Sequence, residues 1–197
     1  MASCLVGSEM CIRDSFWYGK MNESVVSSDL NLIDDATVEA CRSSGARDGE
    51  GIPTRKNTLI ESGKLLGSLW STRDAAQQIA DGRITDVSST GSAIRSGHQS
   101  PPSAGCSNLF LTTGSKTHDF DSMLELMGDG YVVNSVMGAH TANPTSGDFS
   151  VTTSSILRVE NGEIIGSVKQ AGLSGNLAKA LSDKVILGDE VRPQGSY

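Results

Sequence analysis

Aromatic residues, positive charge and long apolar runs are all scarce in this chain of 197 residues. Phe, Trp and Tyr together make up 5% of it, which is too few for a platform on which bases stack. Lys and Arg number 16 against 23 Asp and Glu, so the net charge is -7, and this argues against binding to a phosphate backbone. No run approaches the ~18 apolar residues that a membrane-spanning helix needs. The composition predicts no nucleic-acid partner and no membrane association.

The local motifs that identify most metal and nucleotide sites are also missing. The sequence contains no H-E-x-x-H, H-E-x-x-x-H, C-x-x-C or C-x-x-H pattern, no phosphate-binding G-x-x-x-x-G-K-[ST] loop and no G-x-S-x-G elbow. The three histidines, His98, His118 and His140, lie more than one helical turn apart. Because a zinc site needs three or four converging ligands, we predict no metal ligand, no cofactor and no catalytic residue within this chain.

The N-terminal residues do not resemble a folded domain. Residues 5–14 match a translated sequencing adapter, so we exclude residues 1–15 from the fold as a non-native segment. Residues 16–23 are left unassigned. A secretory signal does not explain the segment, because Glu9 interrupts its apolar stretch and no basic residues precede it. The native part is therefore expected to be one domain over residues 24–197.

Excluding this segment changes the cysteine count. Cys4 and Cys11 are removed with it, and only Cys41 and Cys106 remain, 65 residues apart. Two separated cysteines without a signal peptide favour a reducing compartment, so we expect a cytoplasmic protein. Each thiol is expected to be a small buried or half-buried side chain.

Apolar residues recur at strand spacing, between turns rich in Gly and Ser, over most of residues 24–197. We therefore predict a β-dominated α+β fold, with antiparallel sheets built from hairpins and three short helices. The expected strands are residues 25–33, 54–60, 64–70, 108–111, 131–137, 149–159, 163–169 and 184–187. The expected helices are residues 71–80, a helix capped by Thr117 that runs to Met127, and residues 174–181. Residues 83–107 are expected to form a long loop.

Two predicted hairpins echo each other at an offset of 99 residues. Residues 60–69 match residues 159–168, and each hairpin turns at a glycine, Gly63 or Gly162. These glycines are predicted to be structural turn residues that do not accept a side chain. Either two tight hairpins have converged on one pattern, or two hairpin–helix units pack in one sheet system.

A polar loop between two predicted strands is the main candidate site. It contributes His140, Thr141, Asn143, Asp148 and Ser150, which we predict to bind substrate beside a cleft. In that case His140 exchanges a proton and Asp148 orients a partner. The alternative is a structured turn in which Asn143 and residues 146–148 bond their own backbone. A hydrolytic triad of Ser150, His140 and Asp148 is a third, weaker interpretation.

Residues 47–55 form a second candidate, because Asp48 and Glu50 place two carboxylates close together in the sequence. Paired carboxylates suit acid–base chemistry. The alternative is a pair of solvated acids in a turn that precedes a strand.

These segments carry a family likeness. In their order and spacing they resemble the C-terminal domain of the TldD/PmbA (TldD/TldE) metallopeptidases over residues 24 to about 190. The motifs are Asp48-x-Glu50-Gly51-x-Pro53-Thr54, Ser89-Thr90-Gly91, Asn108-Leu109 followed by Gly114, Gly147-Asp148-Phe149-Ser150, Glu160-Asn161-Gly162-Glu163 and Ser174-Gly175-Asn176-Leu177.

The resemblance implies a subunit of a peptidase that works as a TldD–TldE pair. In that family the TldD-type subunit binds zinc through H-E-x-x-x-H, N-terminal to this region, and a cysteine near the far C-terminus completes the site. Unfolded or small peptides are bound there as added β-strands. This chain lacks the motif and ends at Tyr197, before the family's last strands. Residues 138–141 look more like the TldE (PmbA) type.

The resemblance therefore predicts a fragment of a PmbA/TldE-like subunit, truncated at its C-terminus. It would contribute to peptide binding and subunit assembly in proteolysis without being catalytic alone. Its partner would be a TldD-type subunit that carries the zinc. One alternative is a stand-alone β-rich module that binds peptides or serves a structural role. The other is a metal-independent hydrolase that uses His140, Asp148 and Ser150.

Overall fold

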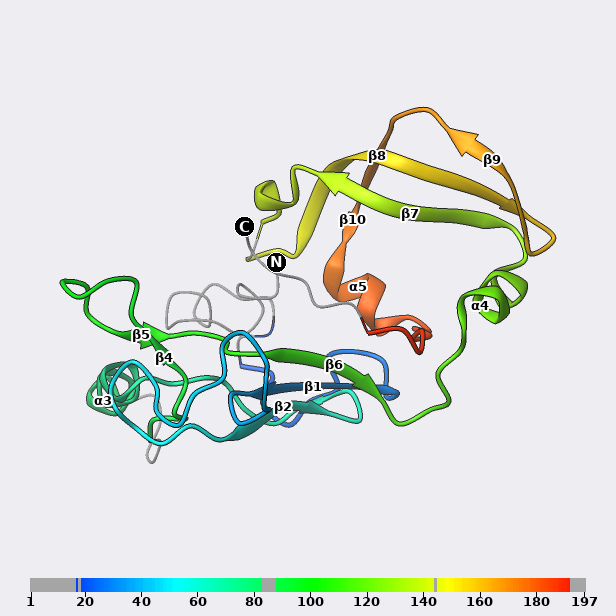
Figure 1. The fold of residues 1–197 in the computed structure, drawn as a ribbon. Helices are drawn as coiled ribbons and strands as arrows, with labels where there is room; N and C mark the ends of the chain where they lie inside the picture. The colour runs from blue at the N-terminus through cyan, green and yellow to red at the C-terminus, as the bar shows by residue number, and fades with distance from the viewer. Residues whose placement is uncertain (1–16, 18, 83–87, 144, 192–197) are drawn as a thin grey trace.

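The computed structural model describes residues 17, 19–82, 88–143 and 145–191. Over these residues the chain forms ten β-strands and three α-helices (Figure 1). All strand pairs between these elements are antiparallel, which confirms the predicted β-dominated α+β class. The predicted non-native segment, residues 1–15, lies outside the described residues.

The first sheet has four strands in the order β3-β2-β1-β6. Its strands are β1 (Leu30–Asp35), β2 (Lys56–Glu61), β3 (Lys64–Leu65) and β6 (Leu109–Thr113). Along β1 every second residue is buried, so Leu30, Leu32 and Asp34 share the face that covers the core. The predicted strand over residues 25–33 therefore begins later than expected, and Val25 and Val26 join the core as loop residues.

The first hairpin turns at Ser62 and Gly63, which adopt φ of 48° and 77°. Its second arm ends at Leu65, not at Trp70 as predicted. The N–H groups of Leu66 and Gly67 both donate to the carbonyl of Leu59, so the chain leaves the ladder at once. Beyond this bend, Leu69 and Trp70 enter the interior as buried residues.

Helix α3 (Thr72–Ala80) confirms the helix expected at residues 71–80. Its N-cap is Ser71, whose hydroxyl accepts the N–H of Asp74 at 3.1 Å. The expected loop that follows contains two short paired strands, β4 (Ala93–Ile94) and β5 (Ser103–Ala104). A carboxylate oxygen of Asp74 accepts the N–H of Ala104 at 3.1 Å, a contact 30 residues away that sequence periodicity does not show.

The second sheet is organised around one long strand. Its strands are β7 (Gly130–Met137), β8 (Asp148–Glu160), β9 (Glu163–Val168) and β10 (Ala171–Asn176). One edge of β8 pairs with β7, while its first half pairs with β10 and its second half with β9. The two similar hairpins thus lie in separate sheets, and the idea that they pack in one sheet system is wrong.

The turn of the second hairpin is fixed by the preceding helix, α4 (Phe120–Met127). Asn161 and Gly162 adopt φ of 51° and 80°, and Gly162 donates its N–H to the carbonyl of Gly128 at 2.8 Å. A Cβ at Gly162 would lie 3.1 Å from the Cα of Glu125. The helix is capped by Asp119, not by Thr117 as predicted.

The C-terminal part departs most from expectation. Of the helix predicted at residues 174–181, the first three residues complete β10, and α5 begins only at Leu177 and ends at Ser182. Residues 184–187 form no strand. Instead, Val185 and Leu187 pack against the core of the first sheet together with Leu181, and the backbone next to them forms only an isolated parallel bridge between His118 and Gly188.

Asp34 is a buried acid on the core side of the first sheet, with 1% of its surface exposed. Its Oδ1 accepts the N–H and the hydroxyl of Ser107 at 2.7 and 2.9 Å. Its Oδ2 has no hydrogen-bond partner within the described residues. Burial raises the pKa of Asp34 above its usual value, and the bonds from Ser107 only partly offset this.

We expect Asp34→Asn to raise the free energy of unfolding at pH 7 by about 1 kcal/mol, because the buried charge is removed while an acceptor for Ser107 is retained. Since the folded pKa is raised, the ionised acid costs stability in full above the folded pKa, and this cost falls away as the pH drops from the folded pKa to the lower, unfolded pKa. Thermal melts from pH 7 downward should therefore show the two proteins converging. Glu39→Gln, at an exposed acid, should shift the melting temperature little at any pH. A less stable Asp34→Asn at pH 7 would contradict this account.

Candidate functional site

The predicted polar loop connects β7 to β8 at one end of the second sheet. It leaves β7 at Gly138, with φ of 86°, and passes through the short 3-10 helix η1 (Ala139–Thr141). Asn143 then organises the turn: its Oδ1 accepts the N–H groups of Thr145 and Ser146 at 2.9 and 3.3 Å. Its own N–H donates to the carbonyl of Asp148 at 2.8 Å. The described part of this loop is thus a structured turn, the alternative considered above.

Asp148 is bonded within the same turn. Its Oδ1 accepts from Nδ2 of Asn176 at 2.8 Å, and its Oδ2 accepts from the hydroxyl of Ser146 at 2.7 Å. These bonds, first that of Asn176 and then that of Ser146, lower the pKa of Asp148 and favour its carboxylate. The acid therefore stabilises the junction between β8 and β10.

The other predicted site residues, Thr141, Ser150 and His140, do not converge with Asp148 on one described group. The hydroxyl of Thr141 donates to the carbonyl of Gly138 at 2.7 Å. Ser150 is exposed on β8, opposite Ser174 of β10. The backbone of His140 lies in η1, and its side chain is outside the described part of the structure. Asp148 is bound to Asn176 and Ser146, so the described side chains do not assemble the triad considered in the sequence.

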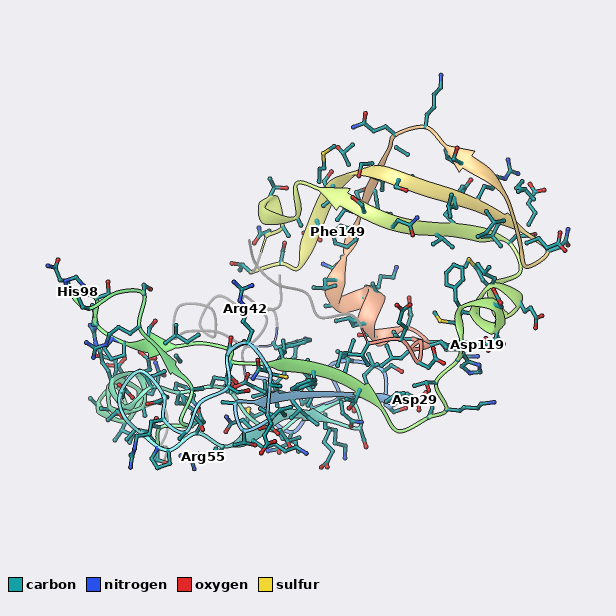
Figure 2. The ribbon with its side chains drawn as sticks, viewed as in Figure 1. Asp29, Arg42, Arg55, His98, Asp119 and Phe149 are labelled. Carbon is teal, nitrogen blue, oxygen red and sulfur yellow. The ribbon has the colours of Figure 1, made fainter. Side chains whose placement is uncertain are left out.

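Two of the sequence motifs meet in this junction. Residues 147–150 and 174–177 lie on adjacent antiparallel strands, with Asp148 opposite Asn176 and Phe149 opposite Gly175. A Cβ at Gly175 would lie 3.1 Å from Cζ of Phe149, so the ring occupies the space that the glycine leaves open. Figure 2 shows Phe149 where β8 and β10 approach α5. Local spacing gives no sign that Asn176 is the partner of Asp148, because the two residues lie 28 positions apart.

The second candidate, Asp48 and Glu50, is also bonded to the backbone. Asp48 Oδ1 accepts the N–H groups of Glu50 and Ile52, both at 2.9 Å, and its Oδ2 accepts that of Ala93 at 3.0 Å. Glu50 Oε2 accepts the N–H of Thr72 at 2.8 Å, in the first turn of α3. The two carboxylates thus hold a turn and a helix end, and they form no acid–base pair in this structure.

The Ser89–Gly91 motif packs against the same turn. Arg55 donates from its guanidinium to the carbonyls of Ser89 and Thr90, and the hydroxyl of Thr90 lies 2.6 Å from that of Ser92. Gly91 has φ of 67°, and a Cβ there would clash with the carbonyl oxygen of Pro53. The motif at residues 89–91 and the motif at residues 48–54 therefore meet where the backbone of Gly91 packs against that of Pro53.

Among the described residues, no strand pairs with the outer edge of β6, which we call the β6 edge. Strand β6 is the last strand of the first sheet (Figure 1). In its antiparallel ladder the carbonyl of Asn108 accepts the N–H of Asp35, and Gly114 donates its N–H to the carbonyl of Asp29, so both bond toward the β1 side. Since the direction alternates along a strand, the N–H and C=O groups of Leu109, Leu111 and Thr113 point away from β1. Such an edge can bind an extended peptide.

The described residues include no group of three or more His, Cys, Asp or Glu side chains placed to hold a metal ion. The side chains of Cys41 and Cys106 are both half-buried. Over the described residues, no helix is long and apolar enough to cross a membrane.

Comparison with known proteins connects these motifs to a family. The family model described as the PmbA/TldA metallopeptidase C-terminal domain matches residues 1–197. An uncharacterized protein of Methanocaldococcus jannaschii is 31% identical over 172 residues, which cover 87% of this chain and 38% of the relative. A metalloprotease TldD homolog of Haemophilus influenzae is 29% identical, over 90% of this chain and 35% of the relative.

Solved structures show the same fold. TldE from Thermococcus kodakarensis aligns with a TM-score of 0.79 at 27% identity, over 95% of this chain and 40% of that one. A protein of Thermotoga maritima aligns with a TM-score of 0.82 at 28% identity, over 98% and 42% of the two chains. This chain thus spans little more than a third of the length of the curated relatives.

Proposed function

This chain belongs to the PmbA/TldA metallopeptidase C-terminal domain family, and on that basis we propose that it binds peptide for a TldD/TldE-type peptidase. In this proposal it is the C-terminal part of a PmbA/TldE-type subunit. It contributes to peptide binding and to assembly in the cytoplasm and performs no hydrolysis by itself. The zinc that activates water would be held by a TldD-type partner subunit.

The TldE-type assignment rests on residues 138–141, whose sequence looks more like that type than like the TldD type. The likeness to TldE from Thermococcus kodakarensis is in keeping with this assignment. Because a TldD homolog also matches, metal analysis of a complex with a TldD-type subunit is the direct test. Zinc should be found in the partner alone.

The free edge of β6 is the observation that carries the peptide-binding proposal. Three alternate residues, Leu109, Leu111 and Thr113, direct their backbone groups outward, so an added strand would gain main-chain hydrogen bonds that depend little on peptide sequence. This suits unfolded or small peptides as ligands. The turn residues His140, Thr141, Asn143, Asp148 and Ser150 remain candidates for additional substrate contacts.

Leu111→Pro tests this edge directly. Proline removes the outward N–H at residue 111 but leaves the β1 ladder intact, because the ladder uses residues 110 and 112. We expect peptide affinity, measured by fluorescence anisotropy with a labelled unstructured peptide, to fall at least about tenfold. Leu111→Ala is the matched control: it shortens the same side chain, retains the N–H and should bind nearly as the parent does. Equal binding by both variants would argue against the β6 edge, and no binding by the parent would argue against peptide binding altogether.

A further inference from the structure

An arginine lies beside the start of β6. Arg42 belongs to the turn at residues 41–44, and hydrogen bonds attach this turn to Asn108, the residue just before the strand. The N–H of Ser43 donates to Oδ1 of Asn108 at 3.2 Å, and Nδ2 of Asn108 donates to the hydroxyl of Ser44 at 2.9 Å. The position of Arg42 relative to the β6 edge is therefore set by its two following residues.

The side chain of Arg42 is exposed. Figure 2 shows it extending past β6, on the side of that strand away from β1. No described acid forms an ion pair with it, although Glu39 is only three residues away in the sequence. Asp35, at the end of β1, instead accepts the N–H and the hydroxyl of Thr37 at its Oδ1, at 2.8 and 2.6 Å. The guanidinium of Arg42 thus offers its N–H donors to a ligand at the start of the β6 edge.

The direction of an added strand decides which end of a peptide reaches Arg42. A peptide that pairs antiparallel with β6 runs from Thr113 toward Leu109, so its C-terminus lies at the start of β6. A guanidinium matches a carboxylate in shape and in charge, and the two can form paired hydrogen bonds. A parallel peptide would instead place its N-terminal ammonium beside this cation, which is repulsive. Arg42 therefore favours antiparallel addition.

The other end of β6 does not set a direction. Asp29 lies at that end, and its Oδ1 accepts the hydroxyl of Ser115 at 2.9 Å (Figure 2). Lys116 follows Ser115 directly, so charges of both signs occur close together there. This end therefore selects neither terminus of a peptide, and Arg42 is the group that distinguishes the two orientations.

We propose that Arg42 binds the C-terminal carboxylate of a peptide that pairs antiparallel with the β6 edge. The ligand class is then a peptide whose free C-terminus lies next to Leu109, and not the interior of a long chain. This inference rests on the proposed function, because it requires a peptide at the β6 edge. Arginine and a terminal carboxylate both stay charged across the neutral pH range, so their pairing should be constant there.

Two labelled peptides of one unstructured sequence without Asp or Glu test this proposal. Both carry the label at the N-terminus, and one ends in a free carboxylate while the other ends in an amide. By fluorescence anisotropy, the parent chain should bind the free-acid peptide about fivefold more tightly, as expected for an exposed ion pair. Arg42→Gln should abolish this difference and leave the affinity for the amide peptide unchanged. Arg73→Gln, at an exposed arginine of α3, is the matched control and should retain the difference.

Each variant is compared with itself on two peptides, so partial unfolding lowers both affinities and cannot imitate a lost difference. Equal binding of both peptides by the parent, with both weakened by Leu111→Pro, would overturn this inference and leave the proposed function standing. A difference that survives in Arg42→Gln would also overturn it. So would an amidated peptide ending in Glu that binds as tightly as the free acid, because Arg42 would then accept any carboxylate. Binding of neither peptide would contradict the proposed function and this inference together.

Discussion

Replacing Gly63 with alanine is expected to lower the free energy of unfolding by about 3 kcal/mol, a large part of what holds a domain of this size. Gly63 has φ of 77°, and an added Cβ would lie 2.6 Å from the carbonyl oxygen of Val26 and 2.8 Å from that of Ser27. Both contacts are with backbone atoms. Neither can be relieved by a side-chain rotation, so the first hairpin would have to shift away from the loop that precedes β1.

A matched glycine separates the two causes of this loss. Gly51 has φ of 83°, but a Cβ there would meet nothing within 4 Å, so Gly51→Ala measures the cost of backbone conformation alone, about 1 kcal/mol. Urea unfolding followed by tryptophan fluorescence gives both values, because Trp70 is buried in the first half of the chain. Equal losses for the two variants would show that the contact with residues 26 and 27 is easily relieved.

The second large effect is expected at Asp48. Its carboxylate accepts three backbone N–H groups, from Glu50, Ile52 and Ala93, so Asp48→Ala leaves all three without this partner and should cost about 3 kcal/mol. The bond to Ala93 also ties the turn to β4, 45 residues away. We therefore expect a lower melting temperature together with increased proteolysis of the segment around β4 and β5.

Asp48→Asn provides the graded control. Its amide oxygen can still accept from Glu50 and Ile52, but its NH₂ group then faces the N–H of Ala93, so an intermediate loss is expected. Glu50→Gln, which retains an acceptor for Thr72, should cost less than about 1 kcal/mol. If Asp48→Ala removed peptidase activity from an assembled complex but left the melting temperature unchanged, Asp48 would have a role in catalysis and would not be needed to stabilise the turn.

Where the sequence predicted correctly, short-range physics was sufficient. Asn161 and Gly162 adopt positive φ because a two-residue turn between twisted strands requires it. Strand β8 ends just before this turn and β9 begins just after it. Helix α3 begins after Ser71 because a hydroxyl is needed to satisfy the first free N–H groups. The turn and the helix start each depend on interactions between residues only a few positions apart in the sequence.

Where the sequence predicted wrongly, the deciding contacts were distant. Residues 171–176 contain two glycines and no strong apolar alternation, and they form β10 because β8 lies beside them. Val185 and Leu187 alternate as in a strand but pack on the first sheet and belong to no strand. The candidate acids Asp48 and Asp148 look chemically available in the sequence, yet backbone and side-chain donors from elsewhere in the chain occupy them.

The sequence by itself determined the β-dominated class, the two hairpin turns and the family, because apolar periodicity, turn residues and motif order are properties of the linear sequence. Only the tertiary structure decided that the hairpins belong to separate sheets, that β6 ends one of them with an open edge and that Tyr131 faces solvent. The reason is that pairing and burial depend on which segments meet in space, and a local pattern fits equally well in a paired, an edge or an uncovered strand.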